Sequence, residues 1–316
     1  MTTFFFFEQL PSLRISNFQA LSISMMRILP QLFYQSPEVT KIFVDGLSCI
    51  VHKELGEAVW HKEGYVSTHA ITLVLKGLLQ VEGDNGERTQ VRPNQMIFLP
   101  KGLYNISDII PESNTTFEAV VFFLDEEIVT DFVTKNNIKP KKDVCASPKI
   151  MNYSKEVKQY TEALLTIYKG KTIGDRNLTR LKLYELLHLI TTTETGCFPE
   201  ALATINNKQR RSLKEFMTAN FAKPLSIEDY AYLTGRSIAS FRRDFVDHFG
   251  VSPKQWLIDK RLAKAKELLA RNGTTVSQIA LEVGYENFSH FVKAFHKKYG
   301  TSPKQFLMKL RKEVLV

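Results

Sequence analysis

Hydrophobic residues alternate with polar ones in the first half of the chain and recur every three or four residues in the second half. Between about Val39 and Leu124, the short apolar runs ITLVLKG, LLQVEG, QMIFLP and FEAVVFFL are separated by polar turn signals. This spacing predicts short β-strands that pack as a small sandwich or barrel. The stretch GDNGER at residues 83–88 predicts a hairpin loop between two of these strands.

The periodicity changes from two to 3.6 residues after residues 134–149, a polar stretch that predicts a loop. The segments YSKEVKQYTEALLTIYKG and NLTRLKLYELLHLITTTE then predict amphipathic helices. Apolar residues of the second segment return on one broad face over residues 178–190. Such a face is either intramolecular core or an exposed dimer seam, and we predict self-association through it. The segment GCFPEALATINN that follows predicts a domain linker.

From Leu213 onward the pattern is helical, and one segment occurs twice. SIEDYAYLTGRSIASFRRDFVDHFGVSPKQWL covers residues 226–257, and TVSQIALEVGYENFSHFVKAFHKKYGTSPKQFL covers residues 275–307. Each copy begins with a capping-box pattern. A small alanine follows, and four residues later a glycine ends the helix and permits a tight turn. The repeat predicts two helix-turn-helix units.

The second helix of each unit has two different faces. Aromatic residues recur every four positions on one face, which predicts core: Phe241, Phe245 and Phe249, and Phe291, Phe295 and Tyr299. The other face mixes small, hydrogen-bonding and cationic side chains, which suits a helix in a DNA major groove. A solvated charged face is the alternative, and two equivalent copies favour DNA. The predicted DNA-contacting residues are Ala239, Ser240, Arg242 and Arg243, and Ser289, His290, Val292, Lys293, His296 and Lys297.

The connection between the two units predicts a rigid separation between them. Gly250 and Gly300 are helix stops, and each is followed by a Ser-Pro pair that begins the next helix. After the first copy, PKQWLIDKRLAKAKELLARN reads as one continuous amphipathic helix. Such a helix would hold two recognition helices at a constant distance.

The charge of the chain is concentrated in its last third. The formal net charge is +9, and residues 205–316 hold 21 Lys and Arg against 10 Asp and Glu, whereas residues 1–204 hold 21 against 23. This asymmetry indicates a nucleic acid or another anionic surface as the partner of the C-terminal region.

Residues from about 213 to 312 resemble the AraC/XylS family of transcriptional regulators. Both units, the connecting helix and IALEVGYENFSHFVKAFHKKYGTSPKQF fit the family pattern. The resemblance implies a bacterial, cytoplasmic regulator, more often an activator, that places its two recognition helices in successive major grooves of double-stranded promoter DNA. By the same resemblance RNA polymerase is a partner, and the first unit reads bases through Ala239, Arg242 and Arg243.

The N-terminal half resembles the cupin-type sensory domain of such regulators in HAITLVLKGLLQVEG and VRPNQMIFLPKGLYNIS. Metal-binding cupins pair histidines on one strand and place another after the PxG turn, but His69 stands alone and Asn105 holds the later position. We therefore predict no metal and no cofactor, and we interpret His52, His61 and His69 as polar strand or loop residues.

The segment LTRLKLYELLHLI resembles the helical dimerisation region of regulators that control type III secretion genes. In those regulators the N-terminal domain answers to a partner protein. The resemblance implies a homodimer, and it leaves the inducer open between a small apolar molecule and a protein.

The sequence thus predicts an α+β chain with four parts. These are a poorly ordered extension (1–28), a cupin-like β-barrel or sandwich (29–150), a helical dimerisation segment and linker (151–200), and an all-α domain of two helix-turn-helix units joined by a long helix (205–316). No segment predicts export or membrane anchoring. The three cysteines form no CxxC pair, which predicts free thiols in a reducing compartment.

Two enzymatic functions are the alternatives to a regulator. One is a cupin-type enzyme with an accessory helical DNA-binding domain, which would need metal ligands. The other is a DNA-repair enzyme, which would need a reactive cysteine, and Cys49, Cys145 and Cys197 stand in no such context. The chain has no Ser-His-Asp pattern, P-loop or dinucleotide fingerprint. We therefore predict a regulator without enzymatic activity.

Overall fold

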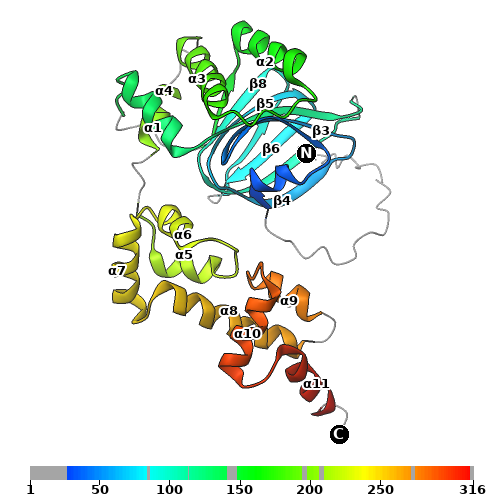
Figure 1. Cartoon of the computed structure of the whole chain (residues 1–316), viewed down its shortest axis with the longest axis vertical. Coiled ribbons are helices and arrows are strands. Elements are labelled where there is room, and N and C mark those ends of the chain that lie inside the picture. The colour runs from blue at the N-terminus through cyan, green and yellow to red at the C-terminus, as the bar shows by residue number, and fades with distance from the viewer. Residues whose placement is uncertain are drawn as a thin grey trace, which may run out of the picture.

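The computed structural model describes residues 27–83, 86–112, 114–140, 148–193, 198–205, 210–271 and 275–313. The strands are β1 (Arg27–Leu29), β2 (Val39–Asp45), β3 (Ser48–Leu55), β4 (Val59–Val66), β5 (His69–Lys76), β6 (Leu78–Gly83), β7 (Arg88–Val91), β8 (Gln95–Leu99), β9 (Gly102–Ile109), β10 (Phe117–Leu124) and β11 (Lys149–Asn152). The helices are the 3₁₀ helix η1 (Gln31–Tyr34), α1 (Glu126–Lys135), α2 (Lys155–Tyr168), α3 (Arg176–Thr193), α4 (Phe198–Thr204), α5 (Leu213–Asn220), α6 (Ile227–Leu233), α7 (Ile238–Phe249), α8 (Pro253–Ala270), α9 (Val276–Glu282), α10 (Phe288–Tyr299) and α11 (Pro303–Glu313). Figure 1 shows the strands gathered in the N-terminal half and α5–α11 in the C-terminal half.

The N-terminal strands form two sheets rather than one closed barrel. One sheet has the order β1-β4-β9-β6-β7, and the other has the order β11-β8-β5-β10-β3-β2. Neighbouring strands pair antiparallel except for β1 and β4. Alternate side chains of both sheets, such as Val51, Val121 and Val81, point into one shared core. The predicted hairpin loop is confirmed, because β6 and β7 pair on either side of it.

Helices α1–α4 cover the outer face of the six-stranded sheet, on the upper side of Figure 1. That face is itself apolar, with Ile50, Ile71 and Phe122 buried beneath the helices. The broad apolar face of α3 supplies the cover, and its side chains Leu183 and Leu187 are fully buried. The prediction that this face is a dimer seam is therefore wrong, because the face packs on the apolar outer surface of the six-stranded sheet.

Several segments differ from what the sequence pattern predicts. The predicted linker contains α4, whose residues Phe198, Ala201 and Leu202 are buried, so it is part of the helical layer. The region between the last predicted strand and residue 149 contains α1, and Lys149 begins β11. Residues 1–26 of the predicted extension lie outside the described residues, but Arg27–Leu29 form β1 and pair with β4. A three-residue strand carries too little pattern to be found in a sequence.

The C-terminal domain consists of two helix-turn-helix units joined by α8. Helices α6 and α7 form the first unit, α9 and α10 the second, and α8 runs between them in Figure 1. The start of α8 packs Trp256 and Leu257 into the core of the first unit. Its second half packs Leu262 and Leu269 into a separate core in the second unit.

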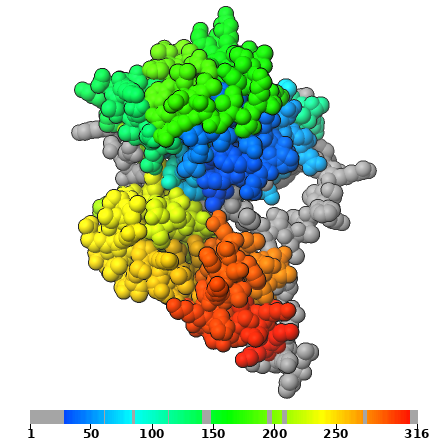
Figure 2. All heavy atoms as spheres, viewed as in Figure 1, coloured from blue at the N-terminus to red at the C-terminus, as the bar shows by residue number. Residues whose placement is uncertain are grey.

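The outer face of the five-stranded sheet contacts the first unit, and Figure 2 shows the yellow atoms of this unit against the N-terminal domain. Tyr65 on β4 and Leu103 on β9 point away from the sandwich and join the core of the first unit. Lys223, in the turn after α5, forms an ion pair with Glu63 on β4. The two domains are therefore joined by apolar and by charged contacts.

The burial of α3 makes a testable distinction between two of its leucines. Leu187→Ala should lower the free energy of unfolding by about 2–5 kcal/mol, because it leaves a cavity under a buried side chain. Leu181 is 60% exposed, so Leu181→Ala should change the free energy of unfolding by less than about 0.5 kcal/mol. Urea titrations followed by circular dichroism measure both values, and equal costs would contradict this assignment of faces.

Candidate nucleic-acid interface

Local capping positions the first helix of each unit. Ser226 Oγ accepts a hydrogen bond from the Asp229 amide at 3.0 Å, and Thr275 Oγ1 accepts one from the Gln278 amide at 3.3 Å. Both capping boxes are complete, as the sequence predicted. Both turns then use a glycine with positive φ, which a residue with a Cβ rarely adopts. The two predicted helix-turn-helix units are confirmed.

Helix α7 presents the predicted residues of the first unit on its open side. Phe241 and Phe245 are fully buried and hold the helix against the core. Ala239, Arg242 and Arg243 are exposed on the remaining surface. The Arg243 side chain is 71% exposed, so its guanidinium can reach a ligand outside the protein. A small residue and two planar cations are suited to base edges and phosphates.

Ser240 does not belong to this open surface. Its side chain is buried, accepts a hydrogen bond from Arg210 Nη2 at 3.2 Å and donates one to Asp244 Oδ2 at 3.4 Å. The prediction that Ser240 contacts DNA is therefore corrected, because its one-position offset from Ala239 rotates it by about 100° toward the core.

Helix α10 presents the residues of the second unit. Phe291 and Phe295 are fully buried, and Ser289, His290 and Lys293 are exposed on the open side. The predicted residues His296 and Lys297 are exposed as well, one turn further along. Val292 is half-buried and packs against the core of this unit, so it lies at the edge of the surface.

An ion-pair network that the sequence did not reveal fixes the orientation of α7. Arg236, in the turn before the helix, donates from Nε to Asp244 Oδ2 at 3.0 Å and from Nη1 to two main-chain carbonyls. The guanidinium of Arg236 lowers the pKa of the Asp244 carboxyl by this hydrogen bond. The corresponding turn of the second unit has Tyr285 at this place, so the network is specific to the first unit.

A second polar cluster joins the first unit to the sandwich. Tyr65 Oη donates to Asp229 Oδ1 at 2.5 Å, and Lys101 Nζ lies 3.0 Å from the same oxygen. Burial alone would raise the pKa of Asp229, but the hydrogen bond from Tyr65 and the charge of Lys101 hold it below its usual value. Asp229 therefore caps α6 and binds the other domain with one carboxylate.

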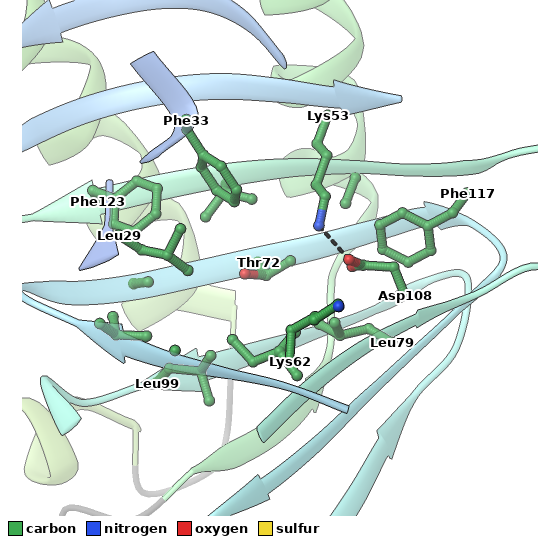
Figure 3. A pocket seen from close by; sticks show the side chains of 16 residues that line it. Leu29, Phe33, Lys53, Lys62, Thr72, Leu79, Leu99, Asp108, Phe117 and Phe123 are labelled. Carbon is green, nitrogen blue, oxygen red and sulfur yellow. Dashed lines mark hydrogen bonds and ion pairs between the residues drawn. The ribbon is translucent and has the colours of Figure 1, made fainter. Parts of the chain in front are cut away.

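The sandwich contains a cavity of about 50 Å³, drawn in Figure 3, whose lining includes Leu29, Phe33 and Phe117. Lys53 on β3 and Asp108 on β9 point toward each other at its edge, with Nζ and Oδ2 2.5 Å apart. A small apolar inducer, one of the two kinds considered above, would need a larger space, since ligand pockets measure roughly 300–1,000 Å³. A cleft of about 480 Å³ between the five-stranded sheet and α5 has that size.

The histidines and the described cysteine have structural environments. His52 on β3 places its Nε2 2.8 Å from Oε1 of Glu118 on β10, and the Lys101 amide donates to His69 Nδ1 at 3.2 Å. The side chain of His61, together with Cys145 and Cys197, lies outside the described residues. Burial raises the pKa of the Cys49 thiol to about 12, so this side chain is a poor nucleophile at neutral pH.

No three His, Cys, Asp or Glu side chains among the described residues come together as a possible metal site. None of the helices that the structure describes combines the length and apolar character needed to cross a membrane.

The fold and the exposed faces of α7 and α10 define the class of this protein. It is a tandem helix-turn-helix protein with an N-terminal β-sandwich. Residues 230–309 match the family model described as a helix-turn-helix domain, and residues 69–197 match the model described as the ExsA N-terminal regulatory domain. The two matches give the chain a helix-turn-helix domain at its C-terminal end and an N-terminal regulatory domain of the ExsA kind.

Characterised relatives resemble parts of the chain. The virulence regulon transcriptional activator VirF of Yersinia enterocolitica is 28% identical over 164 residues, which cover 51% of this chain and 60% of that protein. The HTH-type transcriptional regulator ExsA of Pseudomonas aeruginosa is 27% identical over 127 residues, which cover 40% of this chain and 46% of that protein. The chain thus spans about half the length of these relatives.

A solved structure covers more of the chain at lower identity. The crystal structure of apo ToxT K231A from Vibrio cholerae is 11% identical and covers 84% of this chain and 98% of that one, with a TM-score of 0.37.

The Arg236–Asp244 pair gives a pH-dependent prediction. The pKa of Asp244 is lower in the folded chain than the value of about 3.9 in an unfolded one. Because solvent screens this carboxylate, the pair contributes at most about 1 kcal/mol to the free energy of unfolding. That contribution is present above about pH 4 and is lost as the pH falls through the folded pKa of Asp244. Asp244→Asn should remove this part of the acid sensitivity. Asp247→Asn, which changes an exposed residue of the same helix, is the control.

Urea midpoints of the three proteins between pH 7 and pH 3 measure the effect. Equal acid sensitivity of the wild type and Asp244→Asn would contradict a stabilising role for the pair.

Proposed function

We propose that the chain is a sequence-specific DNA-binding transcription activator that places α7 and α10 in successive major grooves of an asymmetric promoter site. One observation carries the proposal. Two helices of unequal sequence present open faces of small and cationic residues, and both are held on the same helix, α8. Their region holds 21 Lys and Arg against 10 Asp and Glu, which favours the phosphate backbone.

The length of α8 supports binding along one side of the duplex. Its 18 residues span about 27 Å at 1.5 Å per residue. Helix α7 packs on the start of α8 and α10 packs on its second half, so that with the width of the two units added this length is compatible with about 34 Å, one turn of DNA. Because the two units differ in sequence, the proposed site is asymmetric rather than palindromic.

The two units have different chemistry on their open faces. Arg242 and Arg243 on α7 each carry a planar fork that can bind guanine through two hydrogen bonds. Ser289 and Lys293 on α10 offer a hydroxyl and a point charge, which are less directional. The first unit therefore supplies most of the base discrimination, and the second contributes more through the backbone or through RNA polymerase.

The names of the relatives support the direction of regulation. VirF of Yersinia enterocolitica is described as a transcriptional activator, and activation needs a contact with the transcription machinery. RNA polymerase is therefore the protein partner in this proposal, and the bacterial cytoplasm, where promoter DNA lies, is the place of action.

The proposal includes a homodimer that uses the outer surface of the N-terminal helices. Ile167 on α2 and Leu181 on α3 are 55% and 60% exposed and lie on either side of the turn that joins these helices. Ile167→Asp with Leu181→Asp should yield monomers with unchanged folding, because neither side chain belongs to a core. Sedimentation velocity measures this, and a monomeric wild type at high concentration would contradict the dimer.

Substitutions on the two recognition helices test the division of work. Arg243→Ala in the full chain should lose about 1–3 kcal/mol on the cognate site and relax base preference at one position. Lys293→Ala should weaken binding to cognate and to random duplexes by similar factors. It should also lower the number of counterions released on binding, read from the slope of log affinity against log salt concentration, by about one. Binding titrations on single-base variants of a selected duplex, at several salt concentrations, measure both effects.

Two results would contradict the proposal in different ways. Binding that is absent, or independent of salt, would remove the DNA-binding function itself. A change of preferred base in Lys293→Ala, with a uniform loss in Arg243→Ala, would reverse the roles of the two units.

A further inference from the structure

Arg261, in the middle of α8, joins the two helix-turn-helix units through main-chain carbonyls. Its Nε donates to Phe221 O at 2.8 Å, and its Nη2 donates to Lys223 O at 2.6 Å. Both acceptors belong to the segment that leads from α5 into the first unit. Its Nη1 donates to Gly284 O at 3.0 Å, in the turn of the second unit. One side chain thus holds both units.

The position of Arg261 follows from the electrostatics of helix ends. Phe221 is the C-cap of α5, and Gly284 follows the C-cap of α9. The last carbonyls of a helix have no partner within it, and the helix dipole makes that end partly negative. A guanidinium satisfies several such carbonyls at once, because its donors lie in one rigid plane. A lysine ammonium has no such geometry.

The main chains of the two units touch directly beside Arg261. Gly284 has a φ of +87°, and a Cβ at this position would lie 2.5 Å from Ala222 O and 3.1 Å from Arg261 Cζ. The glycine therefore meets two needs, a left-handed turn and a close approach between units. Because no side chain separates the two main chains here, a shift of one unit relative to the other also displaces the carbonyl oxygens that Arg261 binds.

The apolar cores do not provide this link. The first unit packs on Trp256 and Leu257, and the second packs on Leu262 and Leu269, in two separate clusters of buried residues. Within the described residues, the side chain of Arg261 connects the two turns across the space between these clusters.

We propose that Arg261 is the positioning residue that sets the distance and angle between α7 and α10, and with them the spacing between the two halves of the DNA site. This inference rests on the proposed function. One base pair moves a half-site by about 3.4 Å and turns it by about 35°, so spacing preference reports the rigidity of the link.

The spacing of a selected duplex tests the proposal. The probe is a duplex that the full-length wild-type chain selects from a random-sequence library, together with versions that have one base pair inserted or deleted between the two halves. The wild type should lose roughly tenfold or more in affinity for either altered spacing, as expected when one recognition helix leaves its base edges.

Variants of two cations on α8 separate positioning from charge. Arg261→Gln should weaken binding at the original spacing and reduce the penalty for altered spacing to roughly threefold or less, since the units can then adjust separately. Arg261→Lys should resemble Arg261→Gln, because the three donors of an ammonium diverge from one nitrogen atom and cannot match carbonyls that are spread around a planar guanidinium. Lys264→Gln, which removes a cation beside Glu267 on the same helix, should keep the wild-type spacing profile.

Two results of the binding experiment would overturn the proposal. In the first, Arg261→Gln binds more weakly by the same factor at every spacing. In the second, Lys264→Gln flattens the profile as much as Arg261→Gln does.

A measurement without DNA keeps the inference independent of the proposed function. Spin labels at Asp247→Cys on α7 and Lys304→Cys on α11, in a full chain with Cys145 and Cys197 replaced by serine, give the distribution of distances between the units. Arg261→Gln or Arg261→Lys should broaden it, and Lys264→Gln should not. An unchanged distribution in both Arg261 variants would overturn the proposal, whereas failure of the wild type to select any duplex would overturn only the proposed function.

Discussion

Helix α8 contributes to two hydrophobic cores at once, and the rest of the C-terminal domain depends on this sharing. The helices of the two units have seven and twelve residues, which is too short for stability in water on their own. Phe241 and Phe245 gain a partner in Trp256, and Phe291 and Phe295 gain one in Leu262. Removal of either unit would expose one half of α8. The two open faces therefore belong to one connected body.

The two copies of the repeat fold alike but have different surroundings, and their residues differ accordingly. The third residue of α6 is Asp229, whereas Gln278 occupies the same place in α9. Either side chain completes a capping box. Only the first copy also meets another domain, where the Asp229 carboxylate binds Tyr65 and Lys101. The charge at this position thus reflects the interface with the sandwich rather than the needs of the helix.

Strand β9 contacts both the interior of the sandwich and the first unit. Asp108 points inward and forms an ion pair with Lys53 from the opposite sheet, while Leu103 points outward into the core that contains α6. A buried ion pair adds little net stability, because two charges lose their water, but breaking one partner is costly. The pair therefore favours one packing of the two sheets, and with it one position of the surface that meets the first unit.

The features that the sequence by itself determined are those that depend on neighbours three or four residues away. Caps at Ser226 and Thr275, glycine turns and aromatic stripes each follow from one turn of helix, and all were correctly predicted. The open faces of α7 and α10 followed from the same stripes, because a buried side leaves its opposite side exposed. Ser240 was assigned to the open side although its side chain is buried, because it lies at the border between the two sides.

Tertiary structure alone decided which surface covers each apolar face. The pattern of α3 shows that something must cover Leu183 and Leu187, but only the packing shows that it is the six-stranded sheet and not a second chain. The partners of Arg261 lie 40, 38 and 23 residues away in the sequence, at carbonyls that every residue possesses. No side-chain pattern marks a main-chain acceptor. Such contacts exist only once the helices that expose those carbonyls have packed together.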